Sequence, residues 1–430
     1  MADHEDVDYP VLDERSLPAY LARMPEVASR LGGAPADWVV QEIGDGNVNF
    51  VFAVRGPGGD VCVKQALPYV RAVGAEWPLT PERTSFEYRA LLEHGRYVAG
   101  RVPKPLHYDP HLRLLIVEYL GGLTVMRHGL VAGACYPNFA EHIGSYLAQS
   151  LFFTSDLALA GPDKRILMSL FHTNTEMCQI MEDMVFTEPY WDHPRNRCTS
   201  PQLDDERYQL QRDSRLKIAV ARLKTQYLAN AEALIHGDLH TGSIMVSLDD
   251  TRVIDQEFAC YGPMGFDVGT LLAHLLINYF AQIGHGTPKD PRSKQQEWLL
   301  ETVVEVWTNF RLHFCAFWET SGAGDAYPSL FFADPVGQTA LAEERESYLD
   351  RLFIDTLGFC GAEIIRRIFG FAHTADFDTI TDPDRRASCE RSAIRMAHQL
   401  LVGPSQYQTI TAVTVAARKF GEQFGGDYNK

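Results

Sequence analysis

Two groups of polar and acidic residues, separated by a short apolar run, constrain this chain more than any other feature. Residues 236–240 read His-Gly-Asp-Leu-His, and Asp255 and Glu257 follow the apolar residues around Val253. Asp238 and Asp255 are 17 residues apart, which is about the room for a short loop, a strand, a tight turn and a second strand. This layout can place two carboxylates on opposite sides of a transferring phosphoryl group, where one orients a hydroxyl nucleophile and the other holds Mg²⁺ on nucleotide phosphates.

Each acidic group also has a simpler interpretation. Asp238 alone is explained by a turn that it caps, and Asp255 with Glu257 alone is explained by a solvated acidic turn. The presence of both groups favours chemistry, because a carboxylate such as Asp238 can align a hydroxyl and accept its proton. Asp255 follows a short β-run, and Glu257 would point the same way in an extended segment, so that both could bind Mg²⁺.

The segment 42–49 lies between two predicted strands and carries the Gly44-Asp45-Gly46-Asn47 turn. Glycines at such a turn let backbone N–H groups approach phosphates closely, and Asn47 could donate to a phosphate as well. Only two of the three glycines of a G-x-G-x-x-G loop are present, because Asn49 takes the third place. An Asp-Gly hairpin turn is the commoner explanation of this pattern by itself.

Lys64 lies in a predicted strand in which alternation puts Cys62 and Lys64 on one face and Val61 and Val63 on the other. A strand lysine is usually a solvated edge residue, but its position after the glycine turn favours a contact with phosphates. Glu87, in the helix that follows, could pair with Lys64. An i, i+4 pair with Arg83 on the same helix is an equally good interpretation of Glu87.

Two adjacent arginines, Arg366 and Arg367, lie in a predicted helix whose isoleucines and phenylalanine form an apolar stripe at helical spacing. By helical angle Arg367 borders that stripe and Arg366 is nearly opposite to it. Read alone, the pair indicates a solvated face, and a functional interpretation needs a substrate in the cleft beside the helix.

The order of the predicted elements indicates an α+β fold with a small β-rich N-terminal lobe and a large, mostly helical C-terminal lobe. Strands are predicted at 38–43, 49–55, 60–67 and 112–120, and a Gly121-Gly122 pair follows as a natural hinge. We therefore expect a nucleotide-binding domain over 1–118 and a catalytic and substrate-binding domain over 119–430. Helices are predicted at 139–154, 163–184, 205–231, 266–284, 295–320, 338–357, 359–372 and 387–401.

Composition restricts the partners. The net charge of −17 argues against nucleic acid, whose recognition needs basic patches. The eight cysteines form no C-x-x-C pair, which favours reduced thiols in a cytoplasmic protein. The acidic N-terminus lacks the apolar core of a signal peptide, and the apolar stretch 271–283 is too short and polar to span a bilayer. We therefore expect no membrane partner.

Residues 236–244 and 254–259 resemble the aminoglycoside phosphotransferase and choline kinase group, and within it the methylthioribose kinase family. Ser243 stands where aminoglycoside and choline kinases usually carry Asn, and Asp255-Gln256-Glu257 replaces their second Asp; both departures mark methylthioribose kinases. Residues 42–47, 152–157, 185–190, 261–267 and the helix of the two arginines match the family too, so that the similarity covers nearly the whole chain.

The resemblance implies a protein-kinase-like fold, ATP as co-substrate, Mg²⁺ as cofactor, a homodimer, and transfer to the anomeric O1 hydroxyl of 5-methylthioribose in methionine salvage. Asp238 would be the catalytic aspartate, and Asp267 would brace its loop. Arg366 and Arg367 would contact the sugar or the migrating phosphoryl group. The ATP-binding residues that the resemblance implies are Gly44, Gly46, Asn47, Lys64, Glu118, Tyr119, Leu120, Asp255, Gln256 and Glu257, with Asp255 and Glu257 also binding the metal.

Three other functions compete with this one. An aminoglycoside- or choline-type kinase would share the fold, but two adjacent arginines disfavour a cationic acceptor. A metal-dependent hydrolase would use His236, Asp238 and His240 as ligands from one face of a strand, but this leaves Lys64 unexplained. A nucleotide-binding pseudoenzyme is disfavoured because the acidic residues and Lys64 are all intact.

Overall fold

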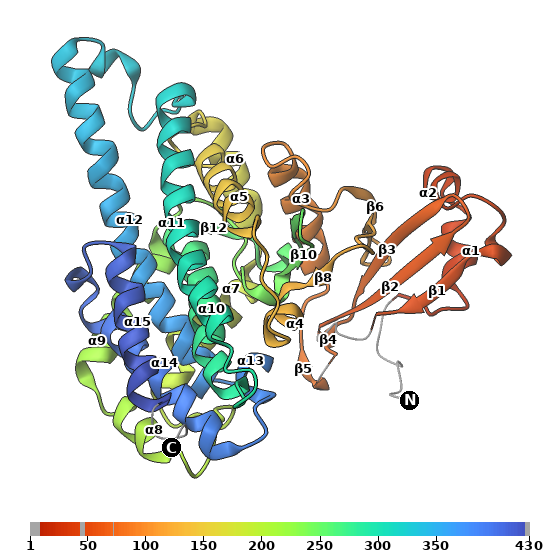
Figure 1. Cartoon of the computed structure of the whole chain (residues 1–430). Coiled ribbons are helices and arrows are strands. Elements are labelled where there is room, and N and C mark those ends of the chain that lie inside the picture. The colour runs from red at the N-terminus through yellow and green to blue at the C-terminus, as the bar shows by residue number, and fades with distance from the viewer. Residues whose placement is uncertain (1–8, 44–47, 72, 426–430) are drawn as a thin grey trace. The chain divides into compact units, whose positions relative to one another are not determined.

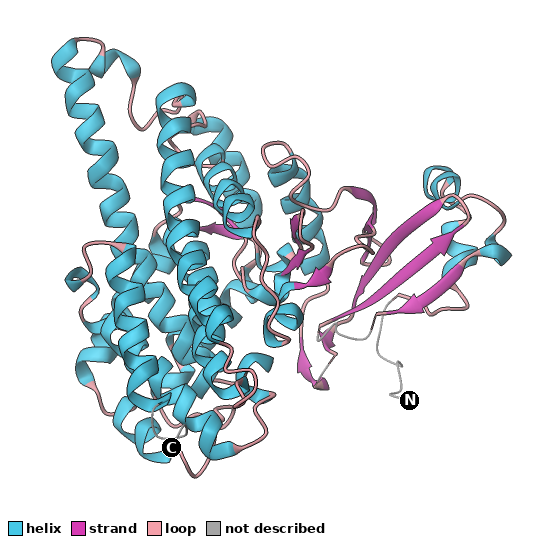
Figure 2. Ribbon diagram, viewed as in Figure 1, coloured by secondary structure: helices cyan, strands magenta, loops and turns pink. Residues whose placement is uncertain are grey.

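The computed structural model describes residues 9–43, 48–71 and 73–425. The chain divides into two compact units, of which unit 1 comprises Met1–Leu123, Asn174–Met177 and Arg252–Ala259. Unit 2 comprises Thr124–Thr173, Cys178–Thr251 and Cys260–Lys430. Unit 1 carries most of the strands and unit 2 most of the helices, which confirms the predicted α+β class (Figure 2).

Unit 1 contains a five-stranded antiparallel sheet in the order β1-β2-β3-β7-β6 and a separate β4-β5 pair (Figure 1). Its elements are α1 (Leu17–Leu21), α2 (Pro25–Leu31), η1 (Pro35–Asp37), β1 (Val39–Glu42), β2 (Asn49–Gly56), β3 (Gly59–Ala66), β4 (Tyr69–Val70), β5 (Gly74–Pro78), α3 (Arg83–Gly95), β6 (Pro105–Asp109), β7 (Leu114–Glu118) and η4 (Gln256–Phe258).

The core of unit 1 confirms the predicted alternation along β3. Val61 and Val63 pack with Leu114 and Ile116 of β7 and with apolar residues of α1 and α2 in one buried cluster. Successive strand residues point to opposite faces, so Lys64 lies on the face away from that cluster. The short helices α1 and α2, which the sequence did not predict, cover the cluster.

Unit 2 is built from long helices. Its elements are β8 (Thr124–Val125), α4 (Met126–Val131), α5 (Phe139–Phe153), α6 (Gly161–Phe171), η2 (Glu188–Tyr190), α8 (Asp204–Leu210), α9 (Ser214–Ala229), β9 (Ala233–Ile235), η3 (Thr241–Ser243), β10 (Ile244–Val246), β12 (Cys260–Gly262), α10 (Met264–His285), α11 (Ser293–Ser321), η5 (Ser329–Phe332), α12 (Pro335–Phe369), α13 (Ala375–Asp378), α14 (Pro383–Val402), η6 (Pro404–Gln406) and α15 (Ile410–Gly425). Two further elements, α7 (Thr175–Phe186) and β11 (Thr251–Val253), include residues of each unit.

The helix α10 is the central element of unit 2 and packs against α11, α12 and α14 (Figure 1). It is long and apolar enough to cross a membrane by length and composition, but its apolar window is completely buried inside the protein. Two short antiparallel strand pairs flank the loop 236–243. β9 pairs with β12 before the loop, and β10 pairs with β8 after it.

Three predicted helix boundaries are wrong, each for a local reason. The 205–231 helix is two helices, because Asp213 accepts from the amides of Arg215 and Leu216 and begins α9 as an N-cap. The predicted 163–184 helix is likewise divided into α6 and α7, with Asn174 between them. In contrast, 338–357 and 359–372 form one helix, α12, which runs through Gly358.

All eight cysteines are free thiols, as the sequence analysis expected. Gly358 takes part in packing and does not end a helix: a Cβ at this position would lie 2.8 Å from Leu223 Cδ2. Leu223 of α9 therefore packs directly on Gly358 of α12, and a Cβ there would have to displace the Leu223 side chain.

Candidate active site

The loop that carries Asp238 begins directly after β9 and is held by backbone hydrogen bonds. Asp267, at the start of α10, accepts from the amides of His236 at 2.6 Å and Gly237 at 3.0 Å. Gly237 has φ +84°, a left-handed conformation that favours glycine. Asp267 therefore braces the loop, as predicted, and fixes the direction in which Asp238 leaves it.

Both arginines of α12 bind Asp238. Arg366 Nη1 lies 3.0 Å and Arg367 Nη2 3.2 Å from the same oxygen, Asp238 Oδ1. Both arginines are buried, with 3% and 5% of their surface exposed. The interpretation of the pair as a solvated face is therefore wrong, because the close approach of α12 to the loop brings together groups 128 residues apart in sequence.

The two guanidinium groups keep Asp238 ionised. Burial raises the pKa of Asp238, but the charges of Arg366 and Arg367 lower it further, so that the net pKa lies well below its usual value. The second carboxylate oxygen, Oδ2, has His240 Nε2 at 3.5 Å. Burial holds the pKa of His240 well below its usual value, so the ring is neutral near pH 7.

Glu363 is a residue of this site that the sequence analysis missed. It is completely buried, and its carboxylate accepts from Arg367 Nε at 2.6 Å and from Arg366 Nη1 at 3.1 Å. His274 of α10 lies 3.1 Å from the same carboxylate. The sequence offered one signal for Glu363: it precedes Arg366 by three residues and Arg367 by four, so the three side chains can pair on a helix. On a face predicted to be solvated, such pairs do not indicate a functional site.

A row of polar residues on α10 forms the base of the site. Asp267 binds the catalytic loop, His274 binds Glu363, and Asn278 Nδ2 donates to Asp376 Oδ1 at 2.6 Å. Gln282 continues the row and donates to the carbonyl of Leu130 at 2.6 Å. Residues three to four apart share one helix face, so these interruptions of an apolar stretch are hydrogen-bonding positions.

The acidic segment after β11 belongs to unit 1 and is not extended. Asp255 has φ +71° and ψ +47°, a left-handed conformation that Asp tolerates better than most residues, and Gln256–Phe258 form a 3₁₀ turn. The expectation that Asp255 and Glu257 point the same way along an extended segment is therefore wrong. A non-glycine residue held in this conformation is typical of functional sites, where the surrounding structure compensates for the strain.

Lys64 joins this segment to α3. Its ammonium lies 2.6 Å from Glu87 Oε1 and 2.9 Å from Asp255 Oδ1, and Lys64 and Glu87 are both buried. The structure therefore selects the pairing of Glu87 with Lys64 over the pairing with Arg83. Burial lowers the pKa of Lys64, but Asp255 and Glu87 raise it more, so the side chain is a cation.

Arg83 and Asn49 hold Glu257, and neither was predicted. Arg83 is completely buried and lies 3.3 Å from Glu257 Oε2 through Nε. Asn49 accepts from Arg83 Nη2 at 2.7 Å and donates from Nδ2 to Glu257 Oε2 at 2.9 Å. The third glycine position of the loop therefore carries a side chain that links β2 to the acidic segment.

The donor set of unit 1 fits a divalent cation. Asp255 is 44% exposed at its side chain, so its carboxylate can reach a ligand. Burial first, and then the charge of Asp255, raise the pKa of Glu257 to about 7 against the opposing effect of Arg83, and a cation bound between the carboxylates would lower it. Within the described part of the chain, no group of three or more His, Cys, Asp or Glu side chains is arranged around one metal position.

The hinge residues lie at and after the end of β7. The amide of Glu118 already donates to the carbonyl of Lys104 at 2.9 Å, and the carbonyl of Leu120 accepts from Leu123 at 3.0 Å. The ring of Tyr119 lies over Gly121, and a Cβ there, 2.2 Å from the ring, would have to displace it. Gly44, Gly46 and Asn47 of the predicted phosphate loop lie outside the described residues.

The geometry required by the hydrolase interpretation is absent. Residues 236–240 follow the end of β9 and form a loop instead of a strand with three ligands on one face. His236 Nδ1 accepts from the amide of Asp238 at 3.3 Å, and Asp238 binds two arginines. Guanidinium groups on the carboxylate oppose a metal at that position.

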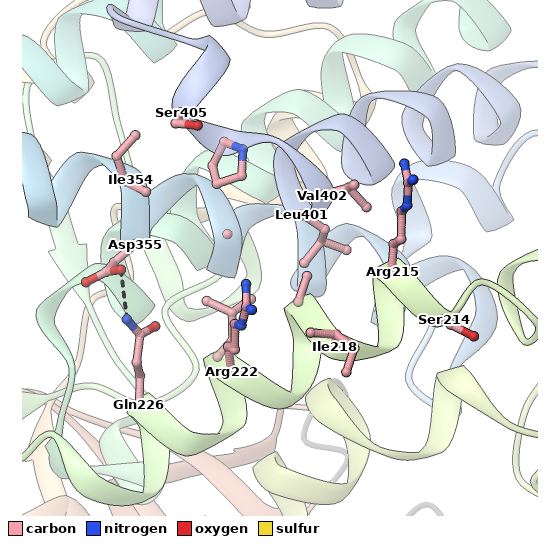
Figure 3. A pocket seen from close by; sticks show the side chains of 14 residues that line it. Ser214, Arg215, Ile218, Arg222, Gln226, Ile354, Asp355, Leu401, Val402 and Ser405 are labelled. Atoms are coloured by element: carbon pink, nitrogen blue, oxygen red, sulfur yellow. Dashed lines mark hydrogen bonds between the residues drawn. The ribbon is translucent and has the colours of Figure 1, made fainter.

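A separate cavity of about 730 Å³ lies between α9, α12 and the segment after α14 (Figure 3). Arg215 and Arg222 of α9 lie along it, and Gln226 Nε2 donates to Asp355 Oδ1 at 2.9 Å across its wall. None of the predicted site residues lines this cavity, so it is not the candidate active site.

Comparisons with known proteins identify the family of the chain. Residues 39–291 match the phosphotransferase enzyme family. Methylthioribose kinase 1 of Oryza sativa subsp. japonica is 42% identical over 413 residues, which cover 95% of each chain. The chain belongs to the methylthioribose kinase family. The Escherichia coli O45:K1 methylthioribose kinase is 39% identical over 97% of this chain and 100% of its own. Among solved structures, a glucosamine kinase aligns over 91% of this chain and 86% of its own, with 15% identity and a TM-score of 0.46.

Within the methylthioribose kinase family, the structure gives a reason for the residue at 243. Ser243 Oγ donates to the carbonyl of Asp238 at 3.3 Å and lies 3.1 Å from His240 Nδ1. A short hydroxyl side chain thus closes the catalytic loop on itself and orients His240 beside Asp238.

Proposed function

We propose that this chain transfers the γ-phosphoryl group of ATP to the O1 hydroxyl of 5-methylthioribose, giving 5-methylthioribose 1-phosphate and ADP in methionine salvage. The observation that carries the proposal is identity of about 40% to methylthioribose kinases over nearly the whole chain. The cluster of Asp238, Arg366 and Arg367 supports it, because this is a site for a neutral hydroxyl and a developing negative charge.

The proposed chemistry assigns a separate task to each oxygen of Asp238. Oδ1 is held by the two guanidinium groups, and Oδ2 accepts the hydrogen bond of the sugar O1–H. The O1–phosphorus bond forms as the bond from the γ-phosphorus to the bridging oxygen of ADP breaks, and the O1 proton passes to Asp238 late in the transfer. Arg366 and Arg367 donate to the phosphoryl oxygens as their charge develops.

Unit 1 supplies the nucleotide site in this proposal, so this site takes in residues 1–118 and also Tyr119, Leu120 and Asp255–Glu257 from the predicted 119–430 domain. Lys64 binds ATP phosphates, with Gly44, Gly46 and Asn47 contributing the loop, and Glu118, Tyr119 and Leu120 meet adenine. Asp255 and Glu257, with Gln256 between them, hold Mg²⁺, which shields the phosphate charge when bound.

The proposal is tested by ADP release from the purified chain with ATP and Mg²⁺. Methylthioribose, ribose, choline and kanamycin serve as parallel acceptors, each with and without excess EDTA. We expect turnover with methylthioribose at least about 10²-fold above the other acceptors, and its loss in EDTA. Preferred turnover of choline or kanamycin would support the alternative, another small-molecule hydroxyl kinase, and turnover resistant to EDTA would contradict the role of Mg²⁺.

We propose further that the chain is a cytoplasmic homodimer with no nucleic acid or membrane partner. The proposal rests on the resemblance for the dimer, on the free thiols for the compartment and on the net charge of −17 for the excluded partners. Light scattering of the purified chain should give twice the mass of one chain across a tenfold dilution. A mass of one chain at every concentration would contradict the dimer.

A further inference from the structure

A third arginine lies against the loop that carries Asp238. Arg127 is on α4, directly after β8, which pairs with β10 beyond the catalytic loop. A Cβ on Gly242 would lie 3.0 Å from Arg127 Nη1 and 2.8 Å from His240 Cε1. Arg127 therefore packs against Gly242 of this loop, where a Cβ would have to displace the Arg127 and His240 side chains.

Asp376 holds the other side of this guanidinium. Asp376 Oδ2 lies 3.5 Å from Arg127 Nε, and the Asp376 carboxylate is completely buried. Asn278 of α10 and Thr374 both donate to Asp376, so its position is fixed independently of Arg127. The row of polar residues on α10 thus positions Arg127 as well as the catalytic loop and Glu363.

Arg127 has hydrogen-bonding capacity that the protein does not use. Its buried Nη2 has no hydrogen-bond acceptor among residues 9–43, 48–71 and 73–425, and its buried Nε has the long ion pair with Asp376 but no hydrogen bond there. A buried donor without an acceptor costs about 1–3 kcal/mol, and more where the group is charged. Buried polar groups without a hydrogen-bond partner are rare in folded proteins, and each calls for an explanation. One explanation is that a bound ligand supplies the missing acceptor.

The charges around Arg127 indicate the kind of ligand. Arg127, Arg366 and Arg367 carry three positive charges, and Asp238, Glu363 and Asp376 carry three negative charges. Burial holds the pKa values of His240 and His274 well below their usual values, so neither ring adds charge. The cluster is therefore neutral overall, which suits a neutral polyol better than an anionic or a cationic acceptor.

We propose that Arg127 is a third substrate-binding arginine, which donates hydrogen bonds to a secondary ring hydroxyl of the acceptor sugar while the O1 hydroxyl is held by Asp238. The proposal rests on the proposed function and makes Arg127 a determinant of specificity for a sugar that retains its 2- and 3-hydroxyl groups. A guanidinium has only donors, so its partner must offer an acceptor, and a hydroxyl oxygen does so without adding charge.

The test combines variants of Arg127 with 2-deoxy and 3-deoxy analogues of methylthioribose. In the unsubstituted protein, removal of the contacted hydroxyl should lower kcat/KM by about 10–10²-fold, the effect of one hydrogen bond to a charged group. Arg127→Met should lose a similar factor with the complete sugar, mainly through KM. In that variant the analogue should react as well as the complete sugar, because the hydroxyl has lost its partner.

Equal penalties for the deoxy analogues in the unsubstituted protein and in Arg127→Met would overturn the proposal. A fall in kcat with unchanged KM would also overturn it and would assign Arg127 to the phosphoryl group. Absence of turnover by the unsubstituted protein would instead refute the proposed function. Arg222→Met, on the exposed side of α9, is the matched control. If Arg127→Met does not fold, Arg127→Lys keeps the charge beside Asp376, and calorimetric titration with the sugar should show the same loss.

Discussion

Replacement of Asp238 by Asn should lower kcat by about 10²–10⁴-fold, the range for loss of a positioned proton acceptor. Asn retains the shape of Asp and an oxygen that can accept from Arg366 or Arg367, but its amide cannot take the O1 proton. Where its NH₂ group faces the two guanidinium groups it has no acceptor, because a guanidinium carries only donors. ADP release at saturating ATP and methylthioribose measures the effect.

The control for this variant is Asp355→Asn. Asp355 is a half-buried carboxylate of α12 that accepts from Gln226 at 2.9 Å and belongs to no part of the candidate active site. Its substitution should leave kcat within about twofold, since changes away from such features rarely exceed ±0.5 kcal/mol. A kcat of Asp238→Asn within tenfold of the unsubstituted protein would remove Asp238 from its proposed role.

Because the pKa of Asp238 is lowered in the folded protein, Asp238 also makes the free energy of unfolding depend on pH. A carboxylate whose pKa is lower in the folded than in the unfolded state stabilises the protein above the unfolded value of about 4. That contribution is lost as the pH falls from the unfolded pKa towards the folded one. The difference in unfolding free energy between the unsubstituted protein and Asp238→Asn should therefore be constant from pH 6 to 8 and shrink below about pH 4.

Replacement of Lys64 by Met should reduce both stability and use of ATP. Removal of one partner of a buried ion pair leaves the other uncompensated, so we expect the free energy of unfolding to fall by about 3–5 kcal/mol. Glu87 is 2% exposed and loses its cation, and Asp255 loses the same contact. The kcat/KM for ATP should fall by about 10²–10³-fold, as when one preorganised donor to a transition state is removed.

A double variant separates the two effects of Lys64. Lys64→Met with Glu87→Leu removes the uncompensated carboxylate, so urea unfolding should show most of the lost stability restored. The kcat/KM for ATP should stay low, because the phosphate contact is still absent. Recovery of ATP use in the double variant would mean that Lys64 acts only in the fold. Lys217→Met, an exposed lysine of α9, is the matched control and should change neither quantity.

Local patterns predicted β1, β2, β3 and β7 of unit 1 but missed β4, β5 and β6, which carry no clear apolar run between turn residues. The alternation in β3 placed Val61 and Val63 in the core and Lys64 on the opposite face, because strand geometry has a fixed period of two. Asp267 as the brace of the catalytic loop was also predicted, although only through the resemblance. Helix ends were predicted less well: the N-cap at Asp213 begins a second helix within one predicted segment, and Gly358 does not end α12.

The sequence by itself determined the strands β1, β2, β3 and β7, the mostly helical character of unit 2 and the identity of the charged residues, because propensity and periodicity act over a few residues. Only the tertiary structure decided the partners of those charges. Asn49 and Glu257 are 208 residues apart, and Arg366 and Asp238 are 128 residues apart, yet each pair shares a hydrogen bond. Arg127 has no local signal, and the spacing of Glu363 to the arginines does not reveal its burial. A buried side chain and a solvated one are identical in sequence, and burial is fixed by which distant helix packs against them.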